Sequence, residues 1–276
     1  MIEQVSQNLI KLKQKFRQSY SGTSHIQEVV PLTKSNSFPI EQSKLDALHM
    51  FATKNPIYYN SYEQKINGVD CMVYEGDINK YWLNSITHGE SYQPFSPTWI
   101  LSAYIITSIA QELNYNEVID VGSGDGRIAY CGKILGLNSH AIEIDDMLVG
   151  LQESLCNLTN TNFHPICADA VNFDYSSLQL QKPVFFIGGL AQMGGDVLAT
   201  NIIENLDSEL KQKTCMVFAG SHSEKYSLGD LSDAGWGELI EKHHLKIVKS
   251  IFLPTVWSFN QTVDTSYIFT EFAQNS

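Results

Sequence analysis

Apolar residues recur with helical spacing at the start of the chain. They lie three or four positions apart, at Ile2, Val5, Leu9, Leu12 and Phe16. This spacing predicts an amphipathic helix over residues 2–20, whose apolar stripe packs on the rest of the protein or on a partner. A second helix is predicted for IEQSKLDALHMFATK. The segment between them, SGTSHIQEVVPLTKSNSFP, is rich in Ser, Thr, Gly and Pro and is predicted to be a loop. The aromatic-rich region after the second helix predicts only a short strand, Cys71–Tyr74.

From residue 94 onward, short apolar runs alternate with helical stretches. A helix is predicted to begin with Ser96 as its cap and Pro97 in its first turn. Strands are then predicted at 117–121, 139–143, 163–167, 183–187, 214–220, 245–254 and 265–273, with helices at 126–136, 146–157, 196–210 and 236–243. This alternation favours a doubly wound, mostly parallel, Rossmann-like sheet. The last two strands are joined by too few residues for a helical crossover, so the last strand should be antiparallel.

The same patterns suggest two parts of the chain. Residues 1–93 form a mainly helical, aromatic-rich extension, and residues 94–276 form the α/β domain. Because Tyr58, Tyr59, Tyr62, Tyr74, Tyr81 and Trp82 gather in the extension, we expect it to cover a cleft of the α/β domain. The sequence does not indicate an oligomeric state.

Composition narrows the class of protein. The chain has 276 residues, of which 43% are hydrophobic and 17% charged, as in folded globular proteins. It has no run of about 18 apolar residues, and charges interrupt its N-terminal stretch, so we expect a cytoplasmic protein without a membrane span. Its 5 cysteines are scattered, and the pair His243–His244 has no third ligand at metal spacing. We therefore expect reduced thiols and no metal.

The charge distribution argues against a nucleic-acid partner. Residues 1–95 carry 9 Lys and Arg against 9 Asp and Glu, so the whole net charge of −12 falls on residues 96–276. Such an acidic surface repels phosphate backbones. The basic residues of the first helix, Lys11, Lys13, Lys15 and Arg17, are interpreted as a solvated face.

The stretch VIDVGSGDGRIAY joins a predicted strand to a predicted helix through three glycines. Gly122, Gly124 and Gly126 leave the main chain bare, so that its N–H groups can approach a ligand. A dinucleotide fingerprint would need glycine where Arg127 stands. Acidic residues instead stand at or just after the carboxyl ends of three consecutive predicted strands: Asp120, Glu143 and Asp169. A sulfonium donor with an amino group, a ribose and no pyrophosphate would benefit from such acids.

Asp-x-Gly-x-Gly-x-Gly followed by Glu143 and Asp169 resembles the class I S-adenosylmethionine-dependent methyltransferases. The resemblance covers roughly Pro94 to the C-terminus and implies that S-adenosylmethionine binds here. The residues expected to bind it are Asp120, Gly122, Ser123, Gly124, Asp125, Gly126, Glu143, Ile144, Asp169, Ala170 and Gly188. Within the superfamily, PFSPTW, GSGDGRIA, IEID and FFIGGLAQMGGDVLATNI look most like the non-SET histone-lysine methyltransferases and their prokaryotic relatives. Those enzymes carry Asn-Asn where this chain has Gly188-Gly189, so histone methylation is not carried over.

The acceptor and the catalytic residue are less clearly marked. Methyl transfer from a sulfonium depends chiefly on alignment, so a base is needed only if the nucleophile must lose a proton. His222 and Tyr92 are candidate bases, although each residue type is more often an ordinary surface or core residue. The motif-like Asn55-Pro56-Ile57-Tyr58 follows a helix and is interpreted as a plain turn. We expect methyl transfer to a protein side chain or small molecule; the alternative is a non-catalytic protein that binds an adenosyl ligand or acts as a scaffold.

Overall fold

The computed structural model describes residues 2–83, 94–220 and 235–273. Its N-terminal segment contains the two expected helices, α1 (Ile2–Ser19) and α2 (Gln42–Lys54). It also contains an antiparallel sheet with strand order β1-β3-β2. The bounds of its elements are β1, Ile26–Pro31; β2, Tyr58–Ile66; β3, Val69–Gly76; and the short helix α3, Asn79–Trp82. The loop prediction for residues 21–39 was therefore wrong where β1 lies, and the predicted strand at Cys71–Tyr74 is part of a longer hairpin.

The second sheet has seven strands in the order β6-β5-β4-β7-β8-β10-β9. Strands β4 to β8 run parallel, and β10 is antiparallel to both of its neighbours. The bounds are β4, Glu117–Val121; β5, Asn138–Glu143; β6, Pro165–Cys167; β7, Pro183–Leu190; β8, Cys215–Ala219; β9, Leu245–Leu253; and β10, Thr265–Phe272. The predicted doubly wound sheet with an antiparallel last strand is confirmed.

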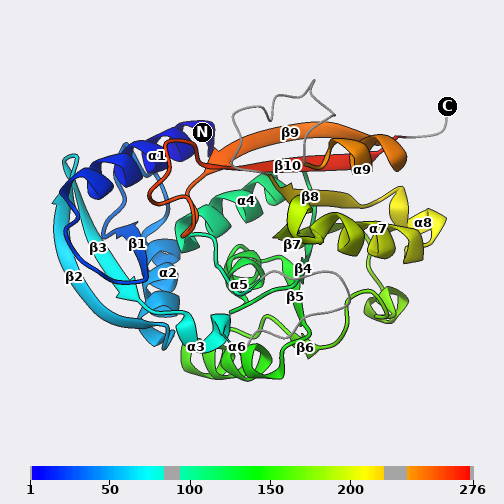
Figure 1. Ribbon diagram of the computed structural model, residues 1–276, viewed down its shortest axis with the longest axis horizontal. Helices are drawn as coiled ribbons and strands as arrows, with labels where there is room; N and C mark the ends of the chain where they lie inside the picture. The colour runs from blue at the N-terminus through cyan, green and yellow to red at the C-terminus, as the bar shows by residue number, and fades with distance from the viewer. Residues whose placement is uncertain (1, 84–93, 221–234, 274–276) are drawn as a thin grey trace.

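Helices lie on both sides of this sheet (Figure 1). Their bounds are α4, Ile100–Glu112; α5, Arg127–Ile134; α6, Asp146–Thr159; α7, Gly195–Asn205; α8, Ser208–Lys211; and α9, Gly237–Lys242, with 3₁₀ turns at Tyr175–Leu178 and Ala191–Met193. The single helix predicted at 196–210 is two helices, because Asp207 caps a new one by accepting from Leu210 N–H.

The predicted cap of α4 was also wrong. The helix begins at Ile100 rather than at Ser96, and the capping residue Trp99 contributes no side-chain hydrogen bond. The carboxylate of Glu28, from β1, instead accepts a hydrogen bond from the Ile100 N–H. An acidic group placed there satisfies a free donor and complements the positive end of the helix dipole.

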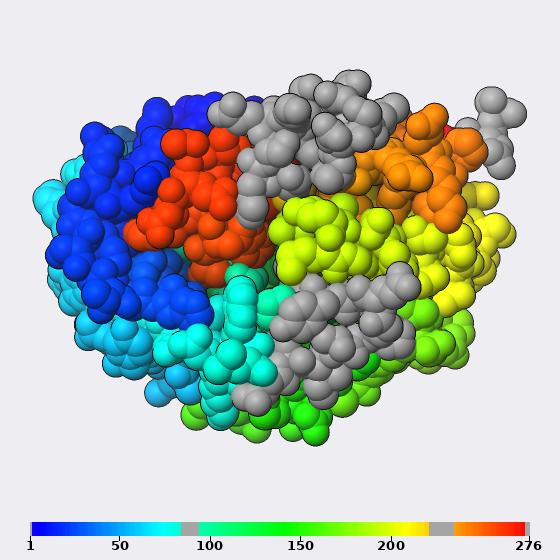
Figure 2. Space-filling model, in the orientation of Figure 1, coloured from blue at the N-terminus to red at the C-terminus, as the bar shows by residue number. Residues whose placement is uncertain are grey.

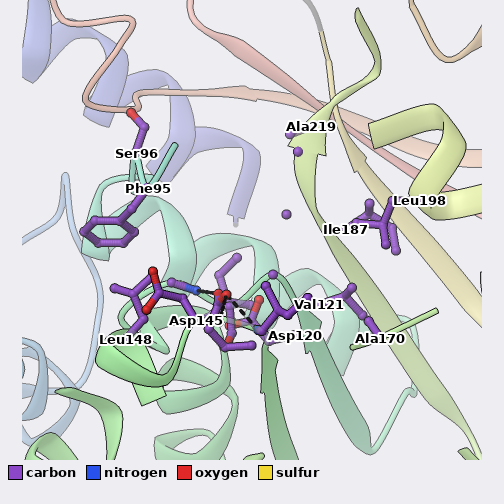
Figure 3. Close-up of a pocket in the computed structure, with 18 of the residues that line it drawn as sticks. Phe95, Ser96, Asp120, Val121, Asp145, Leu148, Ala170, Ile187, Leu198 and Ala219 are labelled. Atoms are coloured by element: carbon purple, nitrogen blue, oxygen red, sulfur yellow. Dashed lines mark hydrogen bonds between the residues drawn. The ribbon is translucent and has the colours of Figure 1, made fainter. Parts of the chain in front are cut away.

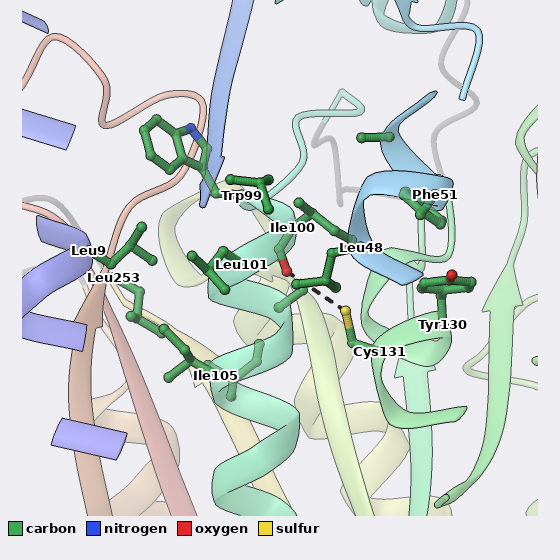
Figure 4. Close-up of a cluster of buried hydrophobic side chains, with 14 of the residues drawn as sticks. Leu9, Leu48, Phe51, Trp99, Ile100, Leu101, Ile105, Tyr130, Cys131 and Leu253 are labelled. Atoms are coloured by element: carbon green, nitrogen blue, oxygen red, sulfur yellow. Dashed lines mark hydrogen bonds between the residues drawn. The ribbon is translucent and has the colours of Figure 1, made fainter. Parts of the chain in front are cut away.

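Successive side chains of the central strands belong to two separate hydrophobic cores, one on each face of the sheet. Val118 packs with the helices α1, α2, α4 and α5, whereas its neighbour Ile119 packs with α7, α8 and α9, as the alternation of side chains along a strand requires. In the first core, Leu9 of α1 and Leu48 and Phe51 of α2 meet Ile105 of α4 and Tyr130 of α5 (Figure 4). The N-terminal segment therefore shares a core with the helices of the main sheet. The domain division at residue 93/94 stays a prediction.

The basic face of α1 is not wholly solvated, contrary to the interpretation of the sequence. Lys13 is fully buried and forms an ion pair with Asp264 at 2.7 Å. Its ammonium also donates to the carbonyls of Ser258 and Gln261, both in the segment between β9 and β10. The orange-red surface of this C-terminal region borders the blue surface of the N-terminal segment in Figure 2. A buried lysine needs such a full set of partners, because its desolvation is otherwise costly.

Within the described ranges, no helix combines the length and apolar character needed to cross a membrane. All five cysteines are free thiols. The cytoplasmic location stays a prediction.

Candidate functional site

A cavity of about 350 Å³ opens at the carboxyl ends of the parallel strands. It lies beside β4, where the chain turns to β5 on one side and to β7 on the other. Ligands of doubly wound sheets bind at such a switch point. Asp120, Asp145 and Leu148 lie along one side of the cavity, and Ile187, Leu198 and Ala219 lie across from them (Figure 3).

The structure brings the predicted binding residues together. All of them except Gly126 line the cavity, although they come from four separate strand ends. The two candidate bases, Tyr92 and His222, lie outside the described residues. Among the residues that the structure describes, no group of three or more His, Cys, Asp or Glu side chains is arranged to hold a metal ion.

The glycine turn is held close to its surroundings. Gly124 has a φ of +57°, and a Cβ there would lie 2.6 Å from the ring of Phe95. A Cβ on Gly188 would lie 2.4 Å from the carbonyl oxygen of Gly122. Position 124 therefore favours glycine for two reasons: its backbone is left-handed, and a side chain would collide with Phe95. Because Gly188 has no side chain, the end of β7 can approach the turn after β4.

Glu143 is bonded directly to this turn. Its Oε2 accepts from the Gly124 N–H at 2.8 Å, and its Oε1 accepts from the N–H groups of Ile144 and Asp145 at 2.9 and 3.1 Å. Burial raises the pKa of Glu143 despite these three donors. Since each carboxylate oxygen has two lone pairs, the side chain retains acceptor capacity toward the cavity.

The other acidic side chains of the cavity differ in how many hydrogen bonds they accept. Asp120 is buried and accepts from the Ala129 N–H at 3.2 Å, and burial raises its pKa well above the ordinary value, with Asp125 and Glu143 adding to the effect. Asp169 accepts from the Val171 N–H at 3.0 Å.

Asp145, which was not predicted from the sequence, caps α6 by accepting from the Met147 N–H at 2.9 Å. Its Oδ2 is buried without a partner among the described residues.

Asp125 is engaged within the wall of the cavity. Its Oδ2 accepts from Arg127 Nη2 at 2.6 Å and from Asn55 Nδ2 at 2.8 Å. Its Oδ1 accepts from Arg127 Nε at 2.9 Å. Residues 56–57 form the turn expected for the Asn55–Tyr58 segment. No sequence pattern indicated that the Asn55 side chain reaches the glycine turn.

Further residues of the cavity lining were not predicted from the sequence. The lining also includes Phe95, whose ring lies against Gly124, and Thr98, Ala219, Trp257 and Tyr267. Tyr267 pairs with Ala219 across the strands, and its hydroxyl donates to Thr98 Oγ1 at 2.6 Å. Thr98 in turn forms an isolated bridge with Thr255. Phe95 and Thr98 belong to the segment PFSPTW, whereas Ala219, Trp257 and Tyr267 come from distant segments that no local motif marks.

Comparison of the sequence with protein-family models finds no match, and no curated protein matches it. Solved structures with a similar arrangement include a proposed RNA methyltransferase from Pyrococcus horikoshii, with 11% identity, a TM-score of 0.46 and coverage of 63% of this chain and 85% of that one. A magnesium protoporphyrin IX methyltransferase from Synechocystis PCC 6803 has 9% identity, a TM-score of 0.45 and coverage of 63% and 78%. The ribosomal protein L11 methylase from Lactobacillus delbrueckii subsp. bulgaricus has 16% identity, a TM-score of 0.43 and coverage of 63% and 79%.

The fold can be identified from the chain's own topology. The parallel strands have their switch point between β4 and β7. Beyond β7 the sheet continues with β8, then with the antiparallel β10, which lies between β8 and β9. The first strand ends in the glycine turn, and the next two strands end beside Glu143 and Asp169. This chain has the fold of the class I S-adenosylmethionine-dependent methyltransferases.

Proposed function

We propose that the chain binds S-adenosylmethionine and transfers its methyl group to a protein side chain or a small molecule. The observation that carries this proposal is the charge of the cavity wall. Five carboxylates line it, those of Asp120, Asp125, Glu143, Asp145 and Asp169. Arg127 is the cation that the described residues contribute, and it is already paired with Glu28 and Asp125.

This charge pattern distinguishes between adenosine-containing ligands. A nucleotide would bring phosphates next to several carboxylates, and the described residues of the lining contribute no unpaired cation to neutralise them, so the Coulomb energy would be unfavourable. S-adenosylmethionine brings a sulfonium, an ammonium and ribose hydroxyls, for which carboxylates are suitable partners. Glu143 at the end of β5 is the acceptor proposed for the ribose, and Asp169 is proposed to face the adenine.

The acceptor is proposed to approach over β7 and β8. Gly188 and Gly189 line the cavity there without side chains and leave room for it. The donor is already activated, so alignment of the acceptor with the methyl group supplies much of the rate. The acidic wall favours neutral or cationic acceptors, and the absence of nucleic acid among the acceptors stays a prediction.

Binding can be tested with S-adenosylhomocysteine. A ligand at 100 times its Kd stabilises the native state by about 2.7 kcal/mol, so the Tm should rise by several degrees. ATP, tested at the same concentration, should leave the Tm unchanged because of its phosphates. No shift with millimolar S-adenosylhomocysteine, or an equal shift with ATP, would contradict the proposal.

The bare Gly188–Gly189 segment also favours a second candidate, a binding protein without turnover, because it places no side chain at the proposed transfer point. Methyl-labelled donor incubated with the protein and a cell extract separates the two candidates. Label transferred to any fraction supports the enzyme. Donor binding without transfer supports the binding protein.

A further inference from the structure

A buried polar cluster connects the N-terminal segment to the glycine turn. It consists of Glu28 on β1, Asn55 after α2, and Asp125 and Arg127 at the start of α5. Each of the four residues is at most 2% exposed. Arg127 bridges the two carboxylates, with Nη1 at 2.5 Å from Glu28 Oε1 and Nη2 at 2.6 Å from Asp125 Oδ2.

The cluster fixes the turn at its centre. Asp125 lies between Gly124 and Gly126, which both have positive φ. Both of its oxygens are held, one by Arg127 and Asn55 and the other by Arg127. The residue between the two glycines is therefore anchored by Asn55 of the N-terminal segment and by Arg127, which Glu28 of that segment holds in turn.

Glu28 also holds the segment that leads into α4, which contributes to the lining of the cavity. Its Oε2 accepts from the Ile100 N–H, and its Oε1 accepts from Tyr58 and Arg127. Arg127 Nη1 donates in addition to the carbonyl of Thr98, a residue of the cavity lining. One carboxylate thus sets the position of the glycine turn relative to the segment that carries Phe95 and Thr98.

We propose that Glu28 is a positioning residue for the donor site, acting through Arg127 and Asp125 on the glycine turn. This inference rests on the proposed function, because its test uses the reaction product S-adenosylhomocysteine as the probe. It makes the N-terminal segment part of the binding machinery, rather than only a cover over it.

Glu28→Gln is the sharpest variant. The two Glu28 oxygens accept from Ile100, Arg127 and Tyr58, which are all donors, so a glutamine amide must turn its NH₂ toward Ile100 N–H or toward Arg127 and Tyr58. Glu117→Gln is the matched control. Glu117 is a buried glutamate at the other end of β4, and its Oε2 accepts from Gln181 N–H at 2.7 Å and Lys182 N–H at 2.8 Å.

The Kd for S-adenosylhomocysteine is measured by calorimetry well below the Tm of each variant, with folding checked by circular dichroism. Both variants should lower the Tm. Only Glu28→Gln should raise the Kd, by about tenfold or more, while Glu117→Gln stays within twofold of wild type. A merely structural role would move the Tm values and leave both Kd values alike.

Asn55→Ala keeps the test decisive if Glu28→Gln does not fold. It removes the amide that holds Asp125 without leaving a charge unpaired, and it should raise the Kd at least threefold. Wild-type Kd values in the folded variants would overturn the positioning role and leave the proposed function standing. A wild-type protein that does not bind the probe would overturn both.

Discussion

The two halves of the cavity differ in chemistry and in origin. The half over β4, β5 and β6 is acidic. Backbone N–H groups hold Asp120, Glu143, Asp145 and Asp169, and the side chains of Arg127 and Asn55 hold Asp125. The half over β7, β8 and β10 is lined by glycine, alanine and aromatic side chains, and it is assembled from segments as distant as Thr98 and Tyr267. The acidic half offers fixed hydrogen-bond acceptors, whereas the other half offers shape and apolar contact.

This difference separates two tasks. The proposed methyl donor is always the same molecule, so its site needs polar groups at fixed positions. Short strand-to-helix connections provide such positions. An acceptor is recognised by the remaining surface, which can change without disturbing the donor groups. The variants below test that division of tasks.

The largest effect is expected for Gly124→Val. Valine would occupy a left-handed backbone conformation, at a cost of about 1–2 kcal/mol, and its Cβ would overlap the ring of Phe95. We expect the Kd for S-adenosylhomocysteine to rise by on the order of 100-fold. Gly136→Val is the control, because Gly136 has a φ of +88° but open space around it. Binding by Gly124→Val within threefold of wild type would show that the acidic half is not the donor site.

Glu143→Ala should have the next largest effect. It removes the proposed acceptor for the ribose hydroxyls and releases the Gly124 N–H. The loss of a charged, buried hydrogen-bond partner typically costs about 1–3 kcal/mol, and calorimetry should show a corresponding loss of affinity. Normal binding by this variant would disprove the role of Glu143.

The acidic half could be predicted because its signals are local. Asp120, the glycines and Glu143 lie within a short stretch, at positions fixed by the ends of two predicted strands. The N-terminal sheet was missed although Asn67-Gly68, with φ values of +50° and +82°, is a strong hairpin signal. Glu28 could not be predicted, because Arg127, its partner, lies 99 positions away. Lys13 was misread for the same reason, since only the folded chain brings Asp264 to it.

Asp120→Asn should raise the stability of the ligand-free protein while weakening ligand binding. Burial raises the pKa of Asp120, so the folded state binds the Asp120 proton more tightly than the unfolded state does. This tighter proton binding stabilises the fold at low pH. The stabilisation is lost as the pH rises above the ordinary pKa of about 3.9. The advantage of the variant should therefore grow from pH 4 toward neutrality. A gain of 1 kcal/mol would raise the Tm by roughly 2–4 °C. An advantage that shrinks with rising pH would contradict the prediction.

Trp257→Ala tests the aromatic half. Trp257 lines the cavity from the segment between β9 and β10, away from the acid-bearing strands. We expect the Kd for S-adenosylhomocysteine to stay within about twofold of wild type, because truncation at a site without ligand contact is nearly neutral. Transfer of label in the extract assay should fall. A tenfold loss of affinity would show that the two halves do not bind separately.

The smallest effect is expected with nucleic acid, where we predict no measurable binding at about 0.15 M salt. Non-specific binders gain affinity by releasing counterions from phosphates, and their Kd is still roughly 10⁻⁴–10⁻⁶ M under these conditions. Residues 96–276 carry the whole net charge of −12, and burial against Asp264 removes Lys13 from the basic face of α1. Fluorescence polarisation with mixed DNA and RNA checks this prediction. Micromolar, salt-sensitive binding would contradict it, and Lys11 and Lys15 would then be the first residues to replace with glutamate, because they remain on the exposed side of the helix.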